Sequence, residues 1–202
     1  MLSLNCPVYV PQFSEEYHCY TNSNAVVLPS VTRILSPISM LEYARVDRDV
    51  LNAAAELGRA VHECIEYLID DDIDEDSLVA EWVPYLEAWK SWRATFNPRF
   101  ISRELRLGCD LYAGTVDCVC EINGQYIVID WKTTDQIMKS VGPQTAAYEL
   151  LVRSHLAHSS LMARAVVQLK GNGTFVFKRF DSVQDYQVFE NLLKLYQWMQ
   201  EK

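Results

Sequence analysis

Carboxylates, a lysine, an amide and a phenol recur at short spacings in three segments of the chain. The segments are residues 114–117 (Gly-Thr-Val-Asp), 130–132 (Asp-Trp-Lys) and 144–148 (Gln-Thr-Ala-Ala-Tyr). Carboxylate oxygens suit hard divalent cations, and a lysine beside such a cation can steady an attacking water or the phosphate that it attacks. Asp117, Asp130 and Lys132 therefore predict metal-dependent phosphodiester hydrolysis.

The strands that we expect around these residues bring the two carboxylates together. Residues 123–124 (Asn-Gly) predict a tight hairpin that pairs the strand of Asp117 with the strand of Asp130. Asp130 and Lys132 are two residues apart, so both point to the same face. The apolar residues 127–129 before them predict a buried strand, where an unpartnered acid or lysine is costly, which favours a site holding a metal or water. The alternative for this acid and lysine alone is an edge-strand salt bridge.

Four further side chains fit such a site. His62 lies one helical turn after Gly58, which would let its helix approach another element closely, and a neutral imidazole can complete a carboxylate metal site. Glu66, four residues later, shares that face and could orient the ring. Gln144 and Tyr148 share one face of another helix, where they suit hydrogen bonds to a substrate or to the lysine. Taken alone, His62 has the simpler interpretation of a structural histidine.

The periodicity predicts an α/β fold with a mixed central sheet flanked by helices. Residues 1–28 are interpreted as an N-terminal arm or short hairpin, and residues 29–202 as a single domain. Ser30 is the expected cap of the first helix, and Pro37 should bend or shorten it. The later helices are expected at 52–69, 78–96, 143–155 and 183–200, with an acidic solvated loop at 70–76. The strands are expected at 100–108, 112–122, 125–133, 161–169 and 174–181.

Charge and composition describe a protein without membrane or export signals. No apolar run approaches the roughly 20 residues of a membrane span, and the N-terminus has no targeting pattern. The six cysteines lack any C-x-x-C pair, which favours buried free thiols in a reducing cytoplasm. The net charge of −9 counts against nucleic-acid binding. It is uneven, however: residues 56–87 hold eleven acids and one base, whereas 128–181 hold seven bases and four acids. We therefore expect an acidic end and a modestly basic catalytic half.

The order Gly-x-x-x-His, Gly-x-x-Asp, Asp-x-Lys, Gln-x-x-x-Tyr resembles the RecB-type branch of the PD-(D/E)xK nuclease superfamily. Residues 29–35, 112–119 and 128–133 look especially like the mitochondrial genome maintenance exonucleases and their phage and bacterial relatives. The resemblance implies a restriction-endonuclease-like core of αβββαβ order and an Mg²⁺ or Mn²⁺ cofactor. It implies no iron–sulfur cluster, because no cysteine follows Cys120. The residues that it implies are His62, Asp117, Asp130 and the Trp131 carbonyl as metal ligands, Lys132 as the catalytic lysine, Gln144 and Tyr148 at the substrate, and Glu104 as a further acid of less certain role.

The function that these expectations describe is a DNA exonuclease acting on single-stranded ends in recombination, repair or degradation. Its location would be the cytoplasm of a bacterium or of a phage-infected cell, with a recombination protein as its partner. The expected DNA contacts are Ser30, Thr32 and Arg33 at a helix start that could receive a phosphate, together with Lys139 and Arg153. Two alternatives stay open: a structure-specific endonuclease, and a non-catalytic acidic interaction protein on the same fold.

Overall fold

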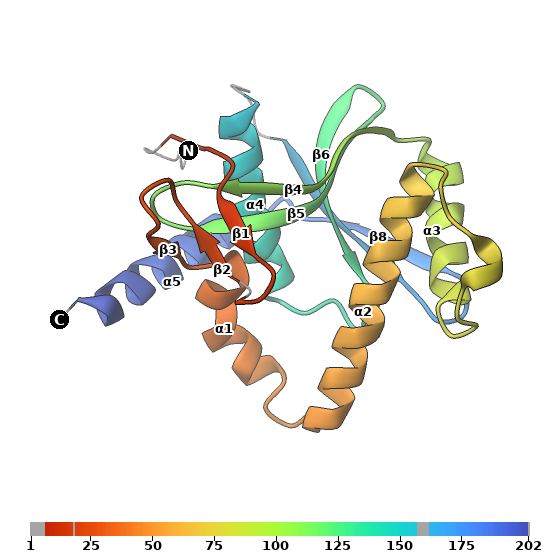
Figure 1. The fold of residues 1–202 in the computed structure, drawn as a ribbon, viewed down its shortest axis with the longest axis horizontal. Helices are drawn as coiled ribbons and strands as arrows, with labels where there is room; N and C mark the ends of the chain where they lie inside the picture. Colours follow the sequence, from red (N-terminus) through yellow and green to blue (C-terminus); the bar gives the residue numbers. More distant parts are fainter. Residues whose placement is uncertain (1–6, 18, 157–161, 202) are drawn as a thin grey trace.

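A five-stranded sheet of mixed direction forms the centre of the molecule (Figure 1). The computed structural model describes residues 7–17, 19–156 and 162–201. The strands occur in the spatial order β4-β5-β6-β7-β8. Their bounds are β4 Arg99–Gly108, β5 Ala113–Ile122, β6 Gln125–Lys132, β7 Ala163–Leu169 and β8 Phe175–Arg179.

The connections explain the mixed directions. Strands β4, β5 and β6 form an antiparallel meander, and β7 and β8 form a second antiparallel pair. Strand β6 pairs in parallel with β7, because α4 (Val141–His155) crosses between them. Asn123 and Gly124 both have positive φ, as the expected two-residue hairpin requires. The predicted α/β fold with a mixed sheet flanked by helices is confirmed.

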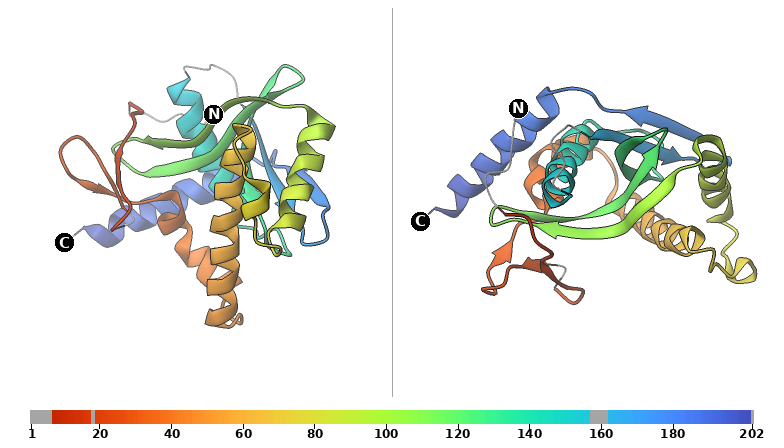
Figure 2. Two further views of the ribbon diagram at one scale, coloured as in Figure 1. Left: turned by 45° about the vertical axis from the view of Figure 1, so that its right-hand side comes forward. Right: turned by 90° about the horizontal axis from the view of Figure 1, so that it is seen from above.

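Helices cover both faces of the sheet, as the two views of Figure 2 help to follow. On one face, α2 (Arg48–Ile69) and α3 (Val83–Phe96) enclose a core that includes Trp89, Trp92 and Trp131. On the other face, α1 (Val31–Glu42), α4 and α5 (Gln184–Gln200) enclose a second core around Tyr112 and Phe189. Among the described residues, no helix is both long enough and apolar enough to cross a membrane.

Three helices differ from the sequence expectation. Helix α2 begins at Arg48, four residues before the expected start at 52. Helix α1 begins after Ser30, whose Oγ accepts the Arg33 N–H at 3.0 Å as a cap, but it continues past Pro37 to Glu42, so the expected shortening is wrong. Helix α3 begins only at Val83, because Pro84 favours a helix's first turn. A short 3₁₀ turn (Glu75–Ser77) occupies part of the preceding acidic segment, which is mostly exposed as expected.

The N-terminal segment is a small antiparallel sheet of β1 (Gln12–Ser14), β2 (Cys19–Thr21) and β3 (Val27–Leu28). It is anchored to the central sheet at three places. Tyr9 and Gly108 exchange backbone hydrogen bonds of 2.8 and 2.9 Å, and the Ala113 N–H donates to the Pro29 carbonyl. The Tyr20 hydroxyl lies 2.7 Å from Thr115 Oγ1. The expected arm or hairpin is thus a three-stranded sheet fixed to β4 and β5.

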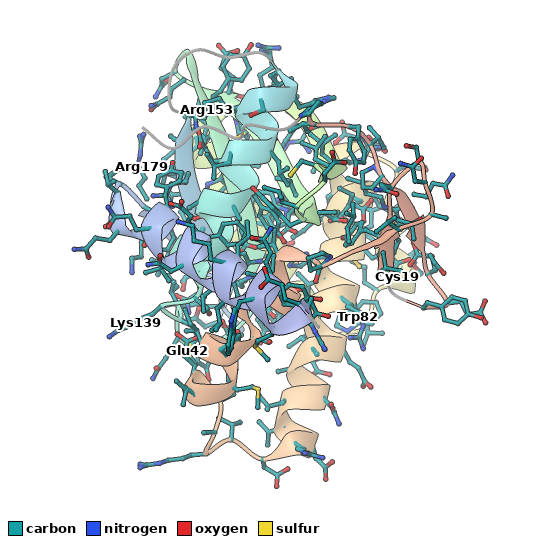
Figure 3. The ribbon with its side chains drawn as sticks, turned by 90° about the vertical axis from the view of Figure 1, so that its left-hand side faces the viewer. Cys19, Glu42, Trp82, Lys139, Arg153 and Arg179 are labelled. Carbon is teal, nitrogen blue, oxygen red and sulfur yellow. The ribbon has the colours of Figure 1, made fainter. Side chains whose placement is uncertain are left out.

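A buried ionic cluster joins α4 to α5 and β7. Glu149 on α4 is fully buried, where it accepts hydrogen bonds from the Met162 N–H and the Tyr186 hydroxyl and pairs with Arg153 at 3.2 Å. Arg153 is itself only 8% exposed (labelled in Figure 3). The expectation that Arg153 contacts DNA is therefore wrong, since its guanidinium neutralises a buried acid.

The cysteines that the structure describes are free, as expected. Four of them are buried: Cys64, Cys109, Cys118 and Cys120. Cys118 and Cys120 face the α2–α3 core beside the tryptophans, where they act as small apolar side chains. Cys6 lies outside the described residues.

Candidate active site

The site forms where strands β5 and β6 separate. Their ladder extends from the hairpin to the pair Cys118–Ile129 and stops before Asp117 and Asp130. Beyond that point the Asp117 side chain replaces a backbone partner: its Oδ2 accepts the Trp131 N–H at 2.8 Å. Strand β6 continues to Lys132 by pairing with β7 alone. The separation gives side chains from both strands room to face one another.

Helix α2 brings His62 to this point. His62 Nε2 lies 3.1 Å from the Trp131 carbonyl oxygen, and Nδ1 lies 3.7 Å from Asp117 Oδ2. A carbonyl can only accept, so Nε2 carries the hydrogen and donates it. In the neutral ring, Nδ1 then presents its lone pair towards Asp117, which is the orientation of a metal-ligating histidine.

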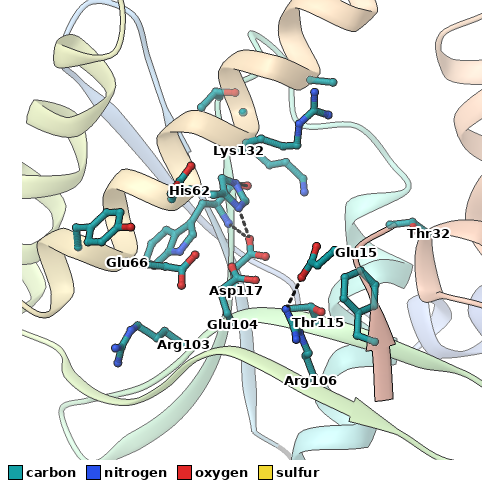
Figure 4. Close-up of a pocket in the computed structure, with 18 of the residues that line it drawn as sticks. Glu15, Thr32, His62, Glu66, Arg103, Glu104, Arg106, Thr115, Asp117 and Lys132 are labelled. Atoms are coloured by element: carbon teal, nitrogen blue, oxygen red, sulfur yellow. Dashed lines mark hydrogen bonds and ion pairs between the residues drawn. The ribbon is translucent and has the colours of Figure 1, made fainter. Parts of the chain in front are cut away.

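Glu104 on β4 completes a group of three possible metal ligands. One ligand atom from each of His62, Glu104 and Asp117 lies within 4.8 Å of the other two (Figure 4). Glu104 has a φ of 42°, a left-handed conformation that is rare within a strand, and the cross-strand pairing of Glu104 with Asp117 is missing at this point. Such strain persists where the surroundings impose it, often at functional sites.

The electrostatics of Glu104 indicate that burial and neighbouring acids outweigh the nearby positive charge of Arg106. Burial, then the nearby charges of Asp117 and Glu66, raise the pKa of Glu104 to about 8. Burial also raises the pKa of Glu66. Two carboxylates and an imidazole in this arrangement are a suitable donor set for a divalent cation, which would neutralise their mutual repulsion. The residues present therefore fit the metal that the sequence predicts.

Asp130 and Lys132 lie on the side of the site that faces α4. Asp130 is 1% exposed; its Oδ2 lies 2.7 Å from Lys132 Nζ, and its Oδ1 accepts from Gln144 Nε2 at 3.0 Å. Burial raises the pKa of Asp130 to about 6, although the lysine opposes this shift. Burial also disfavours the charged lysine, but the carboxylates of Asp130 and Asp117 outweigh it and the pKa of Lys132 is raised. The pair thus joins a buried acid to a half-buried lysine, and α4 holds the acid through Gln144.

Tyr148 packs against β5 beside this pair because Gly114 has no side chain. A Cβ at Gly114 would lie 2.7 Å from Tyr148 Cε1 and 3.2 Å from Val31 Cγ2. Gln144 Nε2 lies 3.5 Å from the Tyr148 hydroxyl, at the limit of a hydrogen bond. Burial raises the pKa of Tyr148 well above its usual value, so the phenol keeps its proton and can donate.

One cavity of about 1070 Å³ is lined by His62, Glu104, Asp117 and Lys132, whereas Asp130, Gln144 and Tyr148 lie outside its lining. Its floor is formed by β4, β5 and the end of β6. One wall is the face of α2 that carries Gly58, His62, Glu66 and Asp70, which are four residues apart and so share a side of the helix. The opposite wall is the N-terminal sheet. The cavity has the dimensions of a ligand site and contains both the carboxylate cluster and the catalytic lysine candidate.

Comparison with protein families decides which proteins this chain belongs with. The family model of the PD-(D/E)XK nuclease superfamily matches residues 40–201. The chain belongs to the PD-(D/E)XK nuclease superfamily. Among solved structures, a crystal structure of a protein called SSO0001 is similar at 16% identity, covering 74% of this chain and 73% of that one with a TM-score of 0.35. A comparison with curated proteins finds no match. The narrower resemblance to RecB-type and mitochondrial exonucleases stays a prediction.

The structure gathers most of the residues that the superfamily motifs indicated. His62 and Asp117 stand together as possible metal ligands, and Glu104 joins them. Asp130 is not in that group; its two oxygens face Lys132 and Gln144 instead. The Trp131 carbonyl faces the His62 ring instead. The roles of Asp130 and Trp131 as ligands of a bound metal stay predictions.

The residues expected to contact DNA are scattered. At the start of α1, Thr32 lines the cavity, whereas Ser30 caps the helix and Arg33 is exposed outside the cavity lining. Lys139 is exposed in the segment before α4 (Figure 3). The expected separation of an acidic end from a basic catalytic half does not hold at the cavity, because the helix that presents His62 also presents Glu63 and Glu66 to it.

Sequence reasoning missed the contribution of the N-terminal sheet. Phe13, Glu15 and Tyr20 line the cavity, and so does Arg106 on β4. Glu104 and Arg106 are two apart on a strand, so an alternating pattern was available as a signal for Arg106. Nothing in the sequence indicated that residues before 29 would reach the site.

Proposed function

We propose that this member of the PD-(D/E)XK nuclease superfamily is a DNA exonuclease that depends on Mg²⁺ or Mn²⁺ and degrades single-stranded ends. The observation that carries the proposal is the placement of His62, Glu104 and Asp117 as a three-donor group in the same cavity as Lys132. The alternative interpretation of Asp130 and Lys132, a salt bridge on an edge strand, does not require a three-donor group beside the pair. The family match supports nuclease activity, and the polarity, strand preference and biological role belong to the proposal.

Each residue has a role that follows from its position. A divalent cation bound by His62, Glu104 and Asp117 would supply Lewis-acid polarisation of the scissile phosphate and a more acidic water. Lys132 reaches into the cavity from the Asp130 side, where its ammonium can hold the attacking water or a phosphate oxygen. Asp130 fixes that ammonium through the 2.7 Å contact. Asp130 and the Trp131 carbonyl would be further ligands of the cation.

Helix α4 supports this arrangement from behind. Gln144 donates to Asp130 Oδ1, which leaves the other oxygen for Lys132. The protonated Tyr148 hydroxyl lies next to that amide and can donate to a substrate oxygen. The two residues thus orient the acid and the lysine and contribute to substrate binding.

The test is digestion of single-stranded and duplex DNA labelled either at one end or internally, with Mg²⁺, Mn²⁺ or EDTA. We expect metal-dependent release of labelled mononucleotides or short products from the single-stranded end. Lys132→Ala should remove the activity. A suitable control is Lys90→Ala, which removes a half-exposed lysine of α3 that pairs with Glu75 and Glu87, outside the cavity lining.

The same experiment separates the alternatives. Cleavage of an internally labelled strand whose ends are blocked indicates an endonuclease. Absence of hydrolysis with either metal, from a folded protein, contradicts the catalytic proposal and favours a binding protein on the nuclease fold.

A further inference from the structure

The N-terminal sheet lies outside the matched family region yet forms one wall of the cavity. The family model begins at residue 40, whereas Phe13, Glu15 and Tyr20 line the same cavity as Asp117 and Lys132. Three contacts with β4 and β5, described above, hold this sheet in place. The wall is therefore a part of this chain's site that the superfamily motifs do not account for.

Strands β4 and β5 place a second pair of side chains, Arg106 and Thr115, beside the candidate metal ligands Glu104 and Asp117. We call Arg106 and Thr115 the second layer and the candidate ligands the metal layer. Arg106 pairs with Thr115 across the strands, and each lies two residues from Glu104 or Asp117 respectively. Two residues of a strand extend about 6.6 Å, which is roughly one nucleotide of an extended nucleic-acid strand. If one phosphate of a nucleic-acid strand lies at the candidate metal ligands, the next phosphate of that strand would therefore lie near Arg106.

The N-terminal sheet surrounds Arg106 in this second layer. The guanidinium lies 4.8 Å from the centre of the Phe13 ring, and Arg106 pairs with Glu15 at 3.0 Å (Figure 4). The Phe13 ring packs against Tyr20 at 4.8 Å between centroids, and the Tyr20 hydroxyl is fixed to Thr115. The arginine is 44% exposed and Glu15 is 74% exposed, so the pair is open to exchange with solvent anions.

We propose that Arg106, Phe13 and Tyr20 form a nucleotide subsite for single-stranded nucleic acid, one phosphate away from the metal centre. The inference rests on the proposed nuclease function and specifies its substrate. A substrate phosphate replaces the Glu15 carboxylate on Arg106. The movement of the guanidinium uncovers the ring face of Phe13 that it now covers, and an unpaired base stacks there, supported by Tyr20.

This subsite favours single strands for a physical reason. A base inside a duplex is stacked on both faces and paired at its edge, so it cannot offer a face to Phe13 without being extruded. An unpaired base has a free face that can stack on an aromatic side chain. The N-terminal sheet would thus make the site prefer single strands, whereas the candidate metal ligands would serve the hydrolysis of any phosphodiester.

The experiment measures binding of a short fluorescein-labelled oligodeoxynucleotide by anisotropy, in a Lys132→Ala background that keeps the strand intact. Phe13→Leu keeps an apolar side chain but removes the aromatic face, and should weaken single-strand binding about tenfold. Arg106→Gln should weaken binding and lower the slope of log K against log salt by about one. Glu15→Gln should tighten binding, up to about fivefold, because it removes a competitor for Arg106.

Two controls separate stacking from general effects. An abasic strand has phosphates without bases, so its binding should respond to Arg106→Gln and not to Phe13→Leu. Arg99→Gln breaks another exposed ion pair on β4 and β5, with Glu121, outside the cavity lining, and should change nothing. Tyr17→Ala removes a 73% exposed aromatic next to the same small sheet and should also be silent.

The results distinguish this inference from the proposed function. If the wild type digests DNA but Phe13→Leu binds single strands as tightly as the parent, or Glu15→Gln weakens binding, the subsite is wrong and the nuclease function stands. If the wild type digests nothing, yet single-strand binding falls in Phe13→Leu and rises in Glu15→Gln, the subsite stands and the catalytic proposal fails.

Discussion

Replacing Gly114 by alanine should damage both stability and the geometry of the site. The added Cβ would lie 2.7 Å from Tyr148 Cε1 and 3.2 Å from Val31 Cγ2. Real Cβ contacts are essentially never as short as 2.7 Å, so something has to move. The ring of Tyr148 is 5% exposed and cannot turn into solvent, so helix α4 has to shift away from β5.

The magnitude follows from two opposed contributions. Inserting a methyl group into a packed interior costs about 1–3 kcal/mol. The change from glycine to alanine within a strand recovers about 0.5–1 kcal/mol of backbone entropy. Because the contact with Tyr148 is so short, the cost of the inserted methyl group should lie in the upper part of its range, at about 2–3 kcal/mol. The net destabilisation is then about 1–2.5 kcal/mol, which lowers the Tm of a chain of this size by roughly 2–10 °C.

The assay is thermal and urea unfolding of two alanine variants in parallel. Gly58→Ala is the matched control, because its Cβ would lie 3.5 Å from Thr133 Oγ1, an ordinary contact. It should leave stability unchanged or raise it by up to about 1 kcal/mol through helix propensity. In a Tyr148→Ala background, Gly114→Ala should lose most of its cost, since the ring that it strikes is gone.

Two results would refute this reasoning. One is a Gly114→Ala protein as stable as the parent; the other is a Gly58→Ala protein that is destabilised more than Gly114→Ala. The activity readout is separate. Because Gln144 on α4 donates to Asp130, displacement of the helix should reduce DNA hydrolysis even at temperatures where Gly114→Ala is fully folded.

Asp117→Ala should abolish hydrolysis and weaken Mn²⁺ binding in calorimetry, because a hard cation depends on anionic oxygen ligands. Lys132→Ala should abolish hydrolysis but leave Mn²⁺ binding nearly unchanged. Equal loss of Mn²⁺ binding in both variants would contradict these roles. His62→Ala should weaken Mn²⁺ binding without unfolding the chain, and a titration indistinguishable from wild type would remove His62 from the ligand set. Burial raises the pKa of Glu149, so the folded state holds this proton more tightly than the unfolded state. Its contribution to stability is therefore present below the unfolded pKa and is lost as pH rises through the folded one. In denaturant titrations at increasing pH, the free energy of unfolding of the wild type should fall relative to that of Glu149→Gln. A rise instead would show that the folded protein stabilises the ionised carboxylate of Glu149.

The sequence by itself determined the order of elements around the site and most of the chemistry. Alternation placed Asp130 and Lys132 on one face of a buried strand, and the Asn123–Gly124 turn fixed which strand Asp117 would pair beside. These features are local: the period of two and the positive φ of a two-residue turn depend on residues within a few positions of each other. The same holds for the Ser30 cap, which bonds an amide three residues away.

Only the tertiary structure decided which donors meet and what surrounds them. Glu104 joins His62 and Asp117 through a left-handed backbone conformation that the packing imposes, and no local pattern indicates it. Arginine is usually a surface residue, but Arg153 is buried against Glu149. The packing of α4 on α5 and β7 determines that pairing. The N-terminal sheet reaches the cavity because bridges from Tyr9 and Pro29 to residues about 100 and 84 positions later in the chain hold it there. Contacts between residues so distant in sequence depend on the whole packed fold, which periodicity and turn signals do not encode.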